Sequence, residues 1–418
     1  MSRDSILVGI DIGSSNIRTI IAQNPRKEIP RVVGVSIVPS FGIRRGVIVD
    51  TEEVAKVINE SVEKSERMAG ITVKKAVVST GGSEIGFQRS KGVVAVGRAD
   101  GEVTENDIQR VLNEVQMVPL SLNREIVHIV PQGYRLDDQE NIKDPVGMRG
   151  VRLEVNALLI EDSASHVKNI AKCLSQSNIE IDDIVLEPLA AAKSVLGKKQ
   201  KELGVVLVNL RGGTTSIAVF EEGELLHTAI IPVGAGHITN DIAIGLRTTV
   251  EVAEKVKLEY GCALPEEISR KEEIDLARID SQEEGSVSRY HVAEIIEARL
   301  EEIFKLVNKE LQSIKRAGLL PAGAVLTGGG AKLPYIADVA KKILGLPTQI
   351  GFPANLGGML NEVDDPSFAT AVGLILWGLE RESILQDGLT GVKVIDNISR
   401  NAEYTVDKMR RWLGRFLP

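Results

Sequence analysis

Three glycine-containing turns, each following an apolar run, are the segments of this chain best suited to hold a phosphate group. They are Gly13-Ser14-Ser15, Gly212-Gly213-Thr214-Thr215 and Gly328-Gly329-Gly330. Glycine allows backbone amides to approach phosphate oxygens closely, because no side chain stands between them. One such turn usually indicates only a tight hairpin. Three at strand ends, two of them similar in sequence, favour phosphate binding.

Two carboxylates accompany these turns. Asp11 stands where the first predicted strand meets its turn. It would either cap the turn or hold Mg²⁺ through water, since Mg²⁺ keeps several waters and takes few protein ligands. Glu187 directly precedes Pro188 at the start of a predicted helix, a position that favours proline. There it would orient the water that attacks a γ-phosphate.

The elements that must position these residues alternate between β-branched runs and amphipathic stretches, which is typical of an α/β protein. The runs at 8–17 and 206–217 share one pattern of apolar run, polar residue, glycine turn and apolar run, which indicates two related halves. The pattern predicts strands at 6–12, 17–22, 32–38, 75–79, 179–186, 204–220 (a hairpin), 225–232 and 322–327. It predicts helices at 51–69, 164–177, 237–246, 250–260, 290–317, 333–344 and 366–379.

The alternation of predicted strands and helices changes between residues 84 and 160, which indicates an inserted α+β module. Strands are predicted near 92–96, 126–134 and 152–159, around one helix at 105–118. The polar stretch 135–150 is predicted as a connection, because it contains turn residues. The charged segment 265–288 is predicted as a solvated loop or as short strands.

Composition excludes several classes of protein. At 418 residues the chain is long enough for about two to four domains. Its net charge of −8 argues against nucleic-acid binding. Its two cysteines have no metal-like spacing. No signal-peptide core is visible, and no apolar stretch reaches the roughly 18 residues that a membrane span needs.

The C-terminal segment differs from this average. Apolar residues fall at helical spacing on one face and cations on the other, a pattern typical of a helix that lies in a membrane interface. The alternative is a terminal helix docked on the body of the protein. The residues predicted to contact the membrane are Met409, Arg410, Arg411, Trp412, Leu413, Arg415, Phe416 and Leu417.

The three turns, the Glu187-Pro188 pair and the helix at 366–379 resemble the phosphate, connect and adenosine motifs of the actin-like ATPase superfamily. Within it, the chain resembles the FtsA family of bacterial cell-division proteins from about residue 6 to residue 418. Three further runs carry this resemblance: GIRRGVIVD at 42–50, DPVGMRGVRLE at 144–154 and GHITNDIAIGLR at 236–247.

The resemblance implies an α/β actin-like ATPase fold, with two RNase-H-like halves around a nucleotide cleft, an inserted α+β subdomain and a C-terminal amphipathic helix. The implied divisions are 1–83 with 161–200 (first actin-like subdomain), 84–160 (insert), 201–235 with 318–385 (second actin-like subdomain), 236–317 (small subdomain beside the cleft), 386–401 (linker) and 402–418 (membrane-targeting helix).

The resemblance also implies ATP and Mg²⁺ as cofactors, with Asp11 holding Mg²⁺ through water and Glu187 positioning the attacking water. Glu254 and Lys257 would approach the adenosine, although helical spacing alone predicts only an exposed i,i+3 pair. The implied nucleotide contacts are Asp11, Gly13, Ser14, Ser15, Asn16, Asn209, Gly212, Gly213, Thr214, Thr215, Glu254, Lys257, Gly328, Gly329, Gly330 and Lys332.

The second turn departs from the family pattern. Relatives usually show Asp-hydrophobic-Gly-Gly-Gly-Thr-Thr-Asp, whereas this chain has Asn209, Arg211 and Ser216 at the first, third and last positions. The change at Asn209 removes an anion that would organise Mg²⁺ and the attacking water. Arg211 either adds positive charge near the phosphates, partly in place of the metal, or points away. Many relatives also carry Lys at the place of Asn16. We expect nucleotide to bind and hydrolysis to be slow or absent.

By the same resemblance, the protein would tether FtsZ filaments to the cytoplasmic membrane, as a peripheral protein on its inner face at the division site. Residues 236–317 would contact the FtsZ C-terminal tail. Which side chains do so stays open, with Arg289 and Arg299 as electrostatically reasonable candidates for an acidic tail. Self-association into filaments, anionic lipid and later division proteins complete the implied partners. The alternative is an ATP-hydrolysing actin-like protein of another role, similar to PilM in pilus assembly or to MreB in cell shape.

Overall fold

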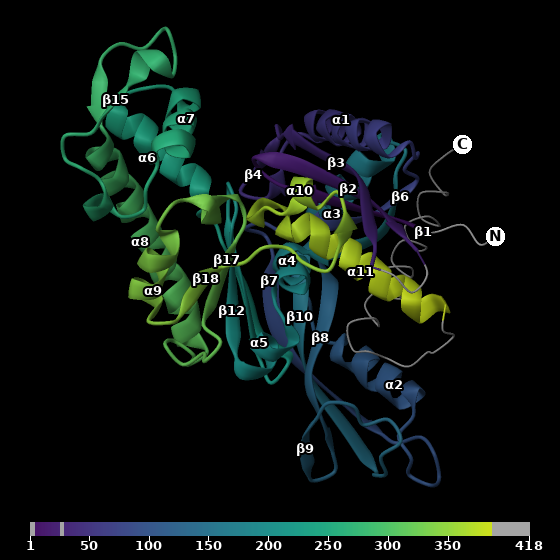
Figure 1. The fold of residues 1–418 in the computed structure, drawn as a ribbon. Helices are drawn as coiled ribbons and strands as arrows, with labels where there is room; N and C mark the ends of the chain where they lie inside the picture. Colours follow the sequence, from purple (N-terminus) through teal and green to yellow (C-terminus); the bar gives the residue numbers. More distant parts are fainter. Residues whose placement is uncertain (1–4, 26–28, 387–418) are drawn as a thin grey trace.

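The structure is a computed structural model that describes residues 5–25 and 29–386 (Figure 1). The predicted membrane-targeting helix at 402–418 lies outside the described residues. So does the predicted linker at 386–401, except for Gln386, which is the last residue of the last helix.

Two sheets form the centre of the molecule, and both follow one strand order (Figure 1). In the first sheet, β3, β2 and β1 are antiparallel neighbours, and β6 and β11 continue it in parallel, with the short β19 added beside β3. In the second sheet, β14, β13 and β12 are antiparallel, and β17 and β18 continue it in parallel. The two halves predicted from the repeated sequence pattern therefore share one topology.

The strands of the first sheet are β1 (Ser5–Ile12), β2 (Asn16–Asn24), β3 (Arg31–Pro39), β6 (Lys75–Thr80), β11 (Glu180–Leu186) and β19 (Gly357–Gly358). Those of the second sheet are β12 (Val205–Leu210), β13 (Thr215–Glu221), β14 (Glu224–Ile231), β17 (Ala324–Thr327) and β18 (Thr348–Ile350). The first hairpin of each sheet places a polar residue one position before the end of its first strand. Asp11 is paired in register with Arg18, and Asn209 with Ser216.

Helices cover both faces of the first sheet. Helices α1 (Thr51–Ala69) and α3 (Ala164–Gln176) bury apolar side chains against one face, and α11 (Ala369–Gln386) packs on the other. The short α4 (Glu187–Val195) packs against both α11 and the second sheet. At Gly373 on α11, a Cβ atom would lie 1.8 Å from the carbonyl oxygen of Ala190. Only glycine allows α11 and α4 to approach this closely between the two halves.

The sequence accounts for the limits of α1. The Asp50 side chain accepts hydrogen bonds from the backbone amides of Glu52 and Glu53 at 3.0 and 3.1 Å. This is the contact by which an aspartate caps a helix N-terminus. The helix ends at Gly70, whose φ of 66° lies in the left-handed region that favours glycine. The predicted helix at 51–69 is confirmed.

A third sheet, in the order β7-β10-β8-β9, packs against the two central sheets and extends away from them, with α2 (Glu105–Val115) on one face (Figure 1). Its strands are β7 (Gly86–Ala95), β8 (Arg124–Leu136), β9 (Gln139–Ile142) and β10 (Arg152–Ser163). Two predictions here were wrong. Strand β7 begins six residues before the predicted 92–96, and β9 lies within the predicted connection at 135–150. Both are polar segments without alternation, and they become strands because neighbouring strands pair with them.

Residues 235–313 form a helical unit beyond the second sheet, which Figure 1 shows at the upper left. Its helices are α6 (Ala235–Leu246), α7 (Val250–Tyr260) and α8 (Arg289–Ser313). The charged segment 265–288 takes the predicted short-strand form, with β15 (Glu273–Asp275) paired to β16 (Ser286–Ser288) beside the 3-10 turns η1 (Pro265–Glu267) and η2 (Leu276–Arg278). Helix α8 ends four residues before the predicted 317.

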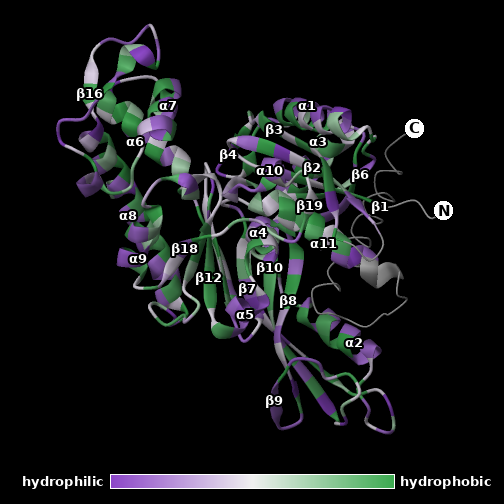
Figure 2. Cartoon of the chain, viewed as in Figure 1, coloured by the Kyte–Doolittle hydropathy of each residue, from purple (hydrophilic) through white to green (hydrophobic). Residues whose placement is uncertain are grey.

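The remaining elements are β4 (Ile43–Arg44), β5 (Val47–Ile48), α5 (Lys198–Leu203), η3 (Gly329–Lys332), α9 (Ile336–Leu344), α10 (Leu360–Val363) and η4 (Pro366–Phe368). Figure 2 shows the exposed α5 in hydrophilic colours, whereas β12 is hydrophobic. Within residues 5–25 and 29–386, no helix is both long and apolar enough to cross a membrane.

A buried histidine joins the inserted sheet to the first sheet. His128 on β8 is fully buried, and its Nε2 accepts a hydrogen bond of 2.9 Å from the backbone amide of Leu186. Its ring lies edge-on to Trp377 of α11, with 5.7 Å between the ring centroids. Burial lowers the pKa of His128 to about 3, because the cationic form would lose its hydration.

This histidine makes stability depend on pH. Folding lowers the pKa of His128. The contribution of the neutral ring to the free energy of unfolding is therefore fully present above the unfolded pKa of about 6.5 and declines as pH falls toward the folded value. The limiting slope of this decline is about 1.4 kcal/mol per pH unit. We predict that the urea midpoint will fall more steeply from about pH 7.5 to about pH 5 for the native protein than for His128→Gln. Gln retains an acceptor for the Leu186 amide but does not titrate. Equal falls in the two proteins would contradict this assignment.

Candidate functional site

The first two glycine turns face each other from the two halves. A Cβ atom at Gly212 would lie 1.9 Å from Ser15 Oγ, and one at Gly213 would lie 2.8 Å from Ser14 Oγ. A side chain at either glycine would displace these hydroxyls and would lie 3.1 Å from the serine Cβ atom behind each of them. The turn at 13–15 and the turn at 211–214 therefore meet because glycine stands on one side of the contact.

Arg211 bridges carboxylates that belong to the other half. Its Nη2 donates to Asp11 Oδ1 at 2.8 Å, and its Nη1 lies 3.2 Å from Glu187 Oε2. Both carboxylates are buried, and the Arg211 side chain is 14% exposed. One guanidinium thus connects the end of β1, the start of α4 and the turn between β12 and β13.

The ionic state of this cluster follows from burial and attraction. Burial by itself would lower the pKa of Arg211, but attraction to Asp11 and Glu187 outweighs it, so the pKa is raised. Burial raises the pKa of Glu187, and the attraction of Arg211 opposes that rise. The guanidinium therefore remains a cation, and it is the main group that favours the ionised form of Glu187.

Neutral hydrogen bonds complete the cluster. Asn209 Nδ2 donates to Glu187 Oε2 at 2.6 Å and lies 3.4 Å from Thr370 Oγ1 on α11. Ser79 Oγ, at the end of β6, donates to Asp11 Oδ1 at 2.9 Å. The amide of Asn209 thus occupies a place where the family pattern has a carboxylate. The amide donates a hydrogen bond to Glu187, whereas a carboxylate there would repel the carboxylate of Glu187.

The third glycine turn lies beside Asn209. Gly328 has a φ of 85°, and a Cβ there would lie 2.5 Å from Asn209 Oδ1. At Gly330 a Cβ would lie 2.9 Å from the Cβ of Ala235, at the start of α6. Gly329 begins η3, and Lys332, its last residue, forms an ion pair of 2.5 Å with Asp365. The structure therefore brings the predicted turns from β1–β2, β12–β13 and β17 into one place.

The other predicted residues of the first two turns serve the hairpins. Asn16 begins β2, and Thr214 closes its turn by accepting a 2.9 Å backbone hydrogen bond from Arg211. Thr215 Oγ1 donates to the carbonyl oxygen of Val233 at 2.8 Å. The first amides of α6, Ala235 and Gly236, donate to the carbonyls of Arg211 and Gly212 at 2.8 Å each. The start of α6 thus holds the second turn in place.

Glu254 and Lys257 form their ion pair on α7, and the prediction of an exposed pair is wrong for Lys257, whereas the side chain of Glu254 is 43% exposed. Lys257 is only 8% exposed, and its Nζ lies 2.6 Å from Glu254 Oε2 and 2.8 Å from Thr239 Oγ1 on α6. Thr239 also donates to Glu254. The two side chains therefore fasten α7 to α6. Their approach to an adenosine stays a prediction.

The groups around Asp11 do not fit the water-bridged Mg²⁺ that the sequence predicts. Asp11 is 2% exposed, and one oxygen, Oδ1, accepts from both Ser79 and Arg211. A divalent cation beside this oxygen would stand next to a guanidinium in a buried site, where like charges repel strongly. Among residues 5–25 and 29–386, no three His, Cys, Asp or Glu side chains gather in a way that could hold a metal ion.

Sequence reasoning missed two parts of this region. Arg18 is paired with Asp11 in the sheet register, and its guanidinium lies 5.6 Å from the ring centroid of Phe368. Burial lowers the pKa of Arg18, an effect that attraction to Asp11 opposes. The segment 42–50 also reaches the site, because Gly46 N donates to Ser14 Oγ at 2.9 Å. Pairing of the first two predicted strands would have placed Arg18 opposite Asp11. No local sequence signal indicated that Gly46 contacts Ser14.

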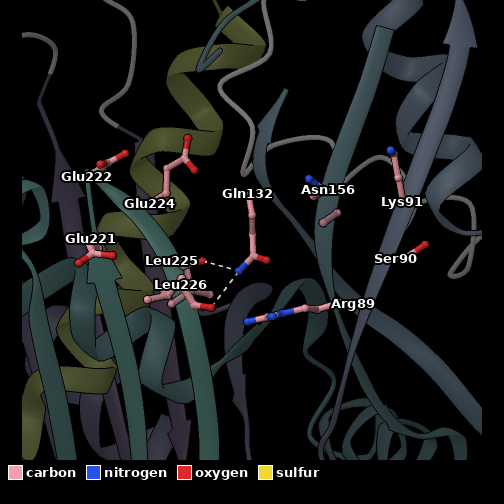
Figure 3. Close-up of a pocket in the computed structure, with 11 residues that line it drawn as sticks. Arg89, Ser90, Lys91, Gln132, Asn156, Glu221, Glu222, Glu224, Leu225 and Leu226 are labelled. Atoms are coloured by element: carbon pink, nitrogen blue, oxygen red, sulfur yellow. Dashed lines mark hydrogen bonds between the residues drawn. The ribbon is translucent and has the colours of Figure 1, made fainter. Parts of the chain in front are cut away.

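A separate cavity of about 560 Å³ lies between the inserted sheet and the β13–β14 hairpin (Figure 3). Gln132 of β8 reaches across it and donates to the carbonyls of Leu225 and Leu226 at 2.8 and 3.0 Å. Glu221, Glu222 and Glu224 line one side, and Arg89 and Lys91 lie on the other. Its lining includes none of the predicted nucleotide contacts.

Known sequences resemble this chain over nearly all of its length. The sequence model of the family described as cell division protein FtsA matches residues 206–373, and that of the SHS2 domain inserted in FtsA matches residues 82–161. Cell division protein FtsA of Pseudomonas aeruginosa is 38% identical over 414 residues, which cover 98% of each chain. That of Bacillus subtilis is 38% identical over 394 residues, covering 94% of this chain and 88% of the relative.

Solved structures are similar in fold at much lower sequence identity. A chain of the PilM-PilN type IV pilus biogenesis complex matches 89% of this chain and 98% of its own length, with a TM-score of 0.63 and 16% identity. MreB 5 of Spiroplasma citri bound to AMPPNP matches 93% of this chain and all of its own, with a TM-score of 0.52 and 15% identity. The chain therefore has the actin-like ATPase fold, as the sequence predicted.

The contact between the two turns generates a stability prediction. Gly212→Ala places a methyl group against Ser15 Oγ, so this hydroxyl must be displaced. We expect a loss of about 1–3 kcal/mol of unfolding free energy, the usual cost of overpacking. Gly197→Ala is the matched control, because its new Cβ would meet only Gln200 Oε1 at 3.6 Å. Thermal denaturation of both variants checks this, and equal melting temperatures would contradict the close approach.

Proposed function

The chain belongs to the FtsA family of cell division proteins, and from this premise we propose that it is an ATP-binding, actin-like cytoskeletal protein that tethers FtsZ filaments to the cytoplasmic membrane. The observation that carries this proposal is 38% identity to an FtsA protein over 98% of both chains. We propose that it acts on the inner face of the membrane at the division site, where it assembles into filaments and recruits later division proteins.

The meeting of three glycine turns supports the nucleotide part of this proposal. Turns from both halves converge within contact distance of Asn209, Ser14 and Ser15. In this arrangement the phosphates of ATP lie between the first two turns, and the adenosine lies toward Glu254 and Lys257. Binding would open the direct contact between the turns. Mg²⁺ at Asp11 does not enter the proposed site, because the guanidinium of Arg211 lies on that carboxylate.

The contacts of Glu187 support slow or absent hydrolysis. A residue that positions the attacking water needs a free carboxylate oxygen near the γ-phosphate. Glu187 Oε2 instead accepts from Asn209 and pairs with Arg211. Both contacts fall on Oε2, and the positive charge of Arg211 makes the carboxylate of Glu187 a weaker acceptor for a water proton. An ATP-hydrolysing enzyme on the same fold would need this carboxylate released, which argues against a role as a catalytic ATPase.

The helical unit at 235–313 is the proposed contact for the FtsZ C-terminal tail. It exposes the large apolar side chains Ile244 and Leu258, at 76% and 71% exposure. The two arginines considered for an acidic tail are already engaged inside this unit. Arg289 pairs with Glu272 at 2.5 Å, and Arg299 binds both carboxylate oxygens of Asp241 at 2.6 and 2.9 Å. Apolar contacts therefore carry more of the proposed recognition than these two charges do.

The composition of the C-terminal segment supports reversible membrane attachment. Each large apolar side chain contributes about 1.5–3 kcal/mol at full burial. Each cation contributes about 1 kcal/mol near anionic lipid. Ordering a short helix opposes both gains. One tail would therefore bind weakly, whereas several tails on one filament would bind much more strongly, which links membrane attachment to self-assembly.

The loss of a carboxylate at position 209 can be tested by restoring it. We predict that Asn209→Asp will raise ATP hydrolysis in Mg²⁺ by at least about tenfold, since a positioned acid–base group contributes about 10²–10⁴ and Arg211 still limits metal access. Phosphate release is the measurement. Asn156→Asp, the same change at an exposed residue of the inserted sheet, is the control. An unchanged rate in Asn209→Asp would show that the missing carboxylate does not limit turnover.

The tethering role predicts a ternary assembly on vesicles. The full chain should sediment with vesicles that contain anionic lipid and should bring FtsZ into the pellet, because the tail binds lipid and the body binds FtsZ. A chain ending at Asn401 should remain in the supernatant and should leave FtsZ there. FtsZ without its C-terminal tail is the second control. The proposal fails if the shortened chain pellets as well as the full chain does.

A further inference from the structure

Arg211 stands where a cation is needed between the two halves. It forms ion pairs with Asp11 and Glu187 through its two terminal nitrogens, at 2.8 and 3.2 Å. A guanidinium carries five N–H donors, so these two contacts leave donors for other acceptors. Nη2 also lies 2.6 Å from the position that a Cβ would occupy at Gly13. The cation is therefore beside the first phosphate turn.

The charges at the site balance without a metal ion. In the family pattern carboxylates replace both Asn209 and Ser216 and a glycine replaces Arg211, so four acidic side chains and no guanidinium require a divalent cation. In this chain Asn209 is neutral, and Arg211 supplies one positive charge to two anions. This leaves one net negative charge among Arg211 and the two carboxylates that it contacts. Arg18, which is paired with Asp11 in the sheet register and is attracted to it, adds a second positive charge nearby.

A divalent cation would gain little at this position. Its carboxylate ligand is already paired, and the nearby guanidinium would repel it across a poorly hydrated interior. Arginine is itself a strong phosphate ligand, because its planar donors match two phosphate oxygens at once. A triphosphate entering between the turns would meet Arg211 first, in the place where other members of the fold would present a metal.

We propose that Arg211 replaces the divalent cation at this site, so that the protein binds a nucleoside triphosphate as the metal-free anion. This inference rests on the proposed nucleotide site and assigns the chemical form of its ligand. The guanidinium performs both tasks of the cation: it neutralises Asp11 and Glu187, and it contacts the phosphate chain. Because a guanidinium is fixed to the backbone, the site needs no free metal to become complete.

The test compares nucleotide affinity with and without metal in the full chain. AMPPNP is titrated by calorimetry in buffer with Mg²⁺ and in buffer with excess EDTA, so that hydrolysis does not contribute. We expect the two dissociation constants to agree within about fivefold, a small difference on the affinity scale. A weakening by more than about fivefold in EDTA overturns the inference and leaves the nucleotide site intact. Absence of binding in both buffers overturns the nucleotide site as well.

Two variants locate the effect at Arg211. Asn209→Asp with Arg211→Gly restores the family pattern, and its AMPPNP binding should weaken at least about tenfold when EDTA replaces Mg²⁺. Arg98→Gly, which removes an exposed arginine in the loop after β7, is the control and should behave as the native chain does. Metal-independent binding by the double variant would contradict the role of Arg211.

A readout without nucleotide keeps the proposal testable if the double variant binds poorly. Mg²⁺ alone should raise the melting temperature of the double variant by several degrees, because a ligand that binds only the folded state stabilises it. The native chain should show no such rise. A rise in the native chain as large as that in the double variant would mean that Arg211 does not exclude the metal.

Discussion

The guanidinium of Arg211 lies between two carboxylates of the opposite half, and the closed arrangement of the glycine turns depends on these ion pairs. A buried charge is tolerated only when it is paired and hydrogen-bonded. Asp11 and Glu187 meet that need together, so the end of β1 and the start of α4 must both face the turn that follows β12. The glycines at 212 and 213 then allow the two turns to touch.

The duplicated topology explains why these groups can meet at all. Each sheet carries its polar residue one position before the end of its first strand, and the two hairpins face each other. One half presents a carboxylate at this position and the other an amide. The amide donates to Glu187, which a second carboxylate could not do. The asymmetry between the halves therefore distinguishes this site from one built from two equivalent acids.

Two further units are attached away from this centre. Figure 1 shows the inserted sheet with α2 at one end of the molecule and the unit of α6, α7 and α8 at another. The second unit is coupled directly to the site, since the first amides of α6 hold the turn that contains Arg211. Opening of that turn by a nucleotide would act on α6. A route thus exists by which nucleotide binding would bias the proposed FtsZ-binding surface of this FtsA-family protein.

Local sequence determined the α/β class, the two related hairpins, the three glycine turns and the helix at 51–69, because each depends on neighbouring residues. It also showed the departure at Asn209 and Arg211, but not which way Arg211 points. Only the tertiary structure decided that, since the partners of Arg211 come from residues 11 and 187. Strand β9 and the polar part of β7 were likewise set by pairing with distant strands. The burial of Lys257 was decided by the packing of α7 on α6, because spacing along one helix does not show which face another helix will cover.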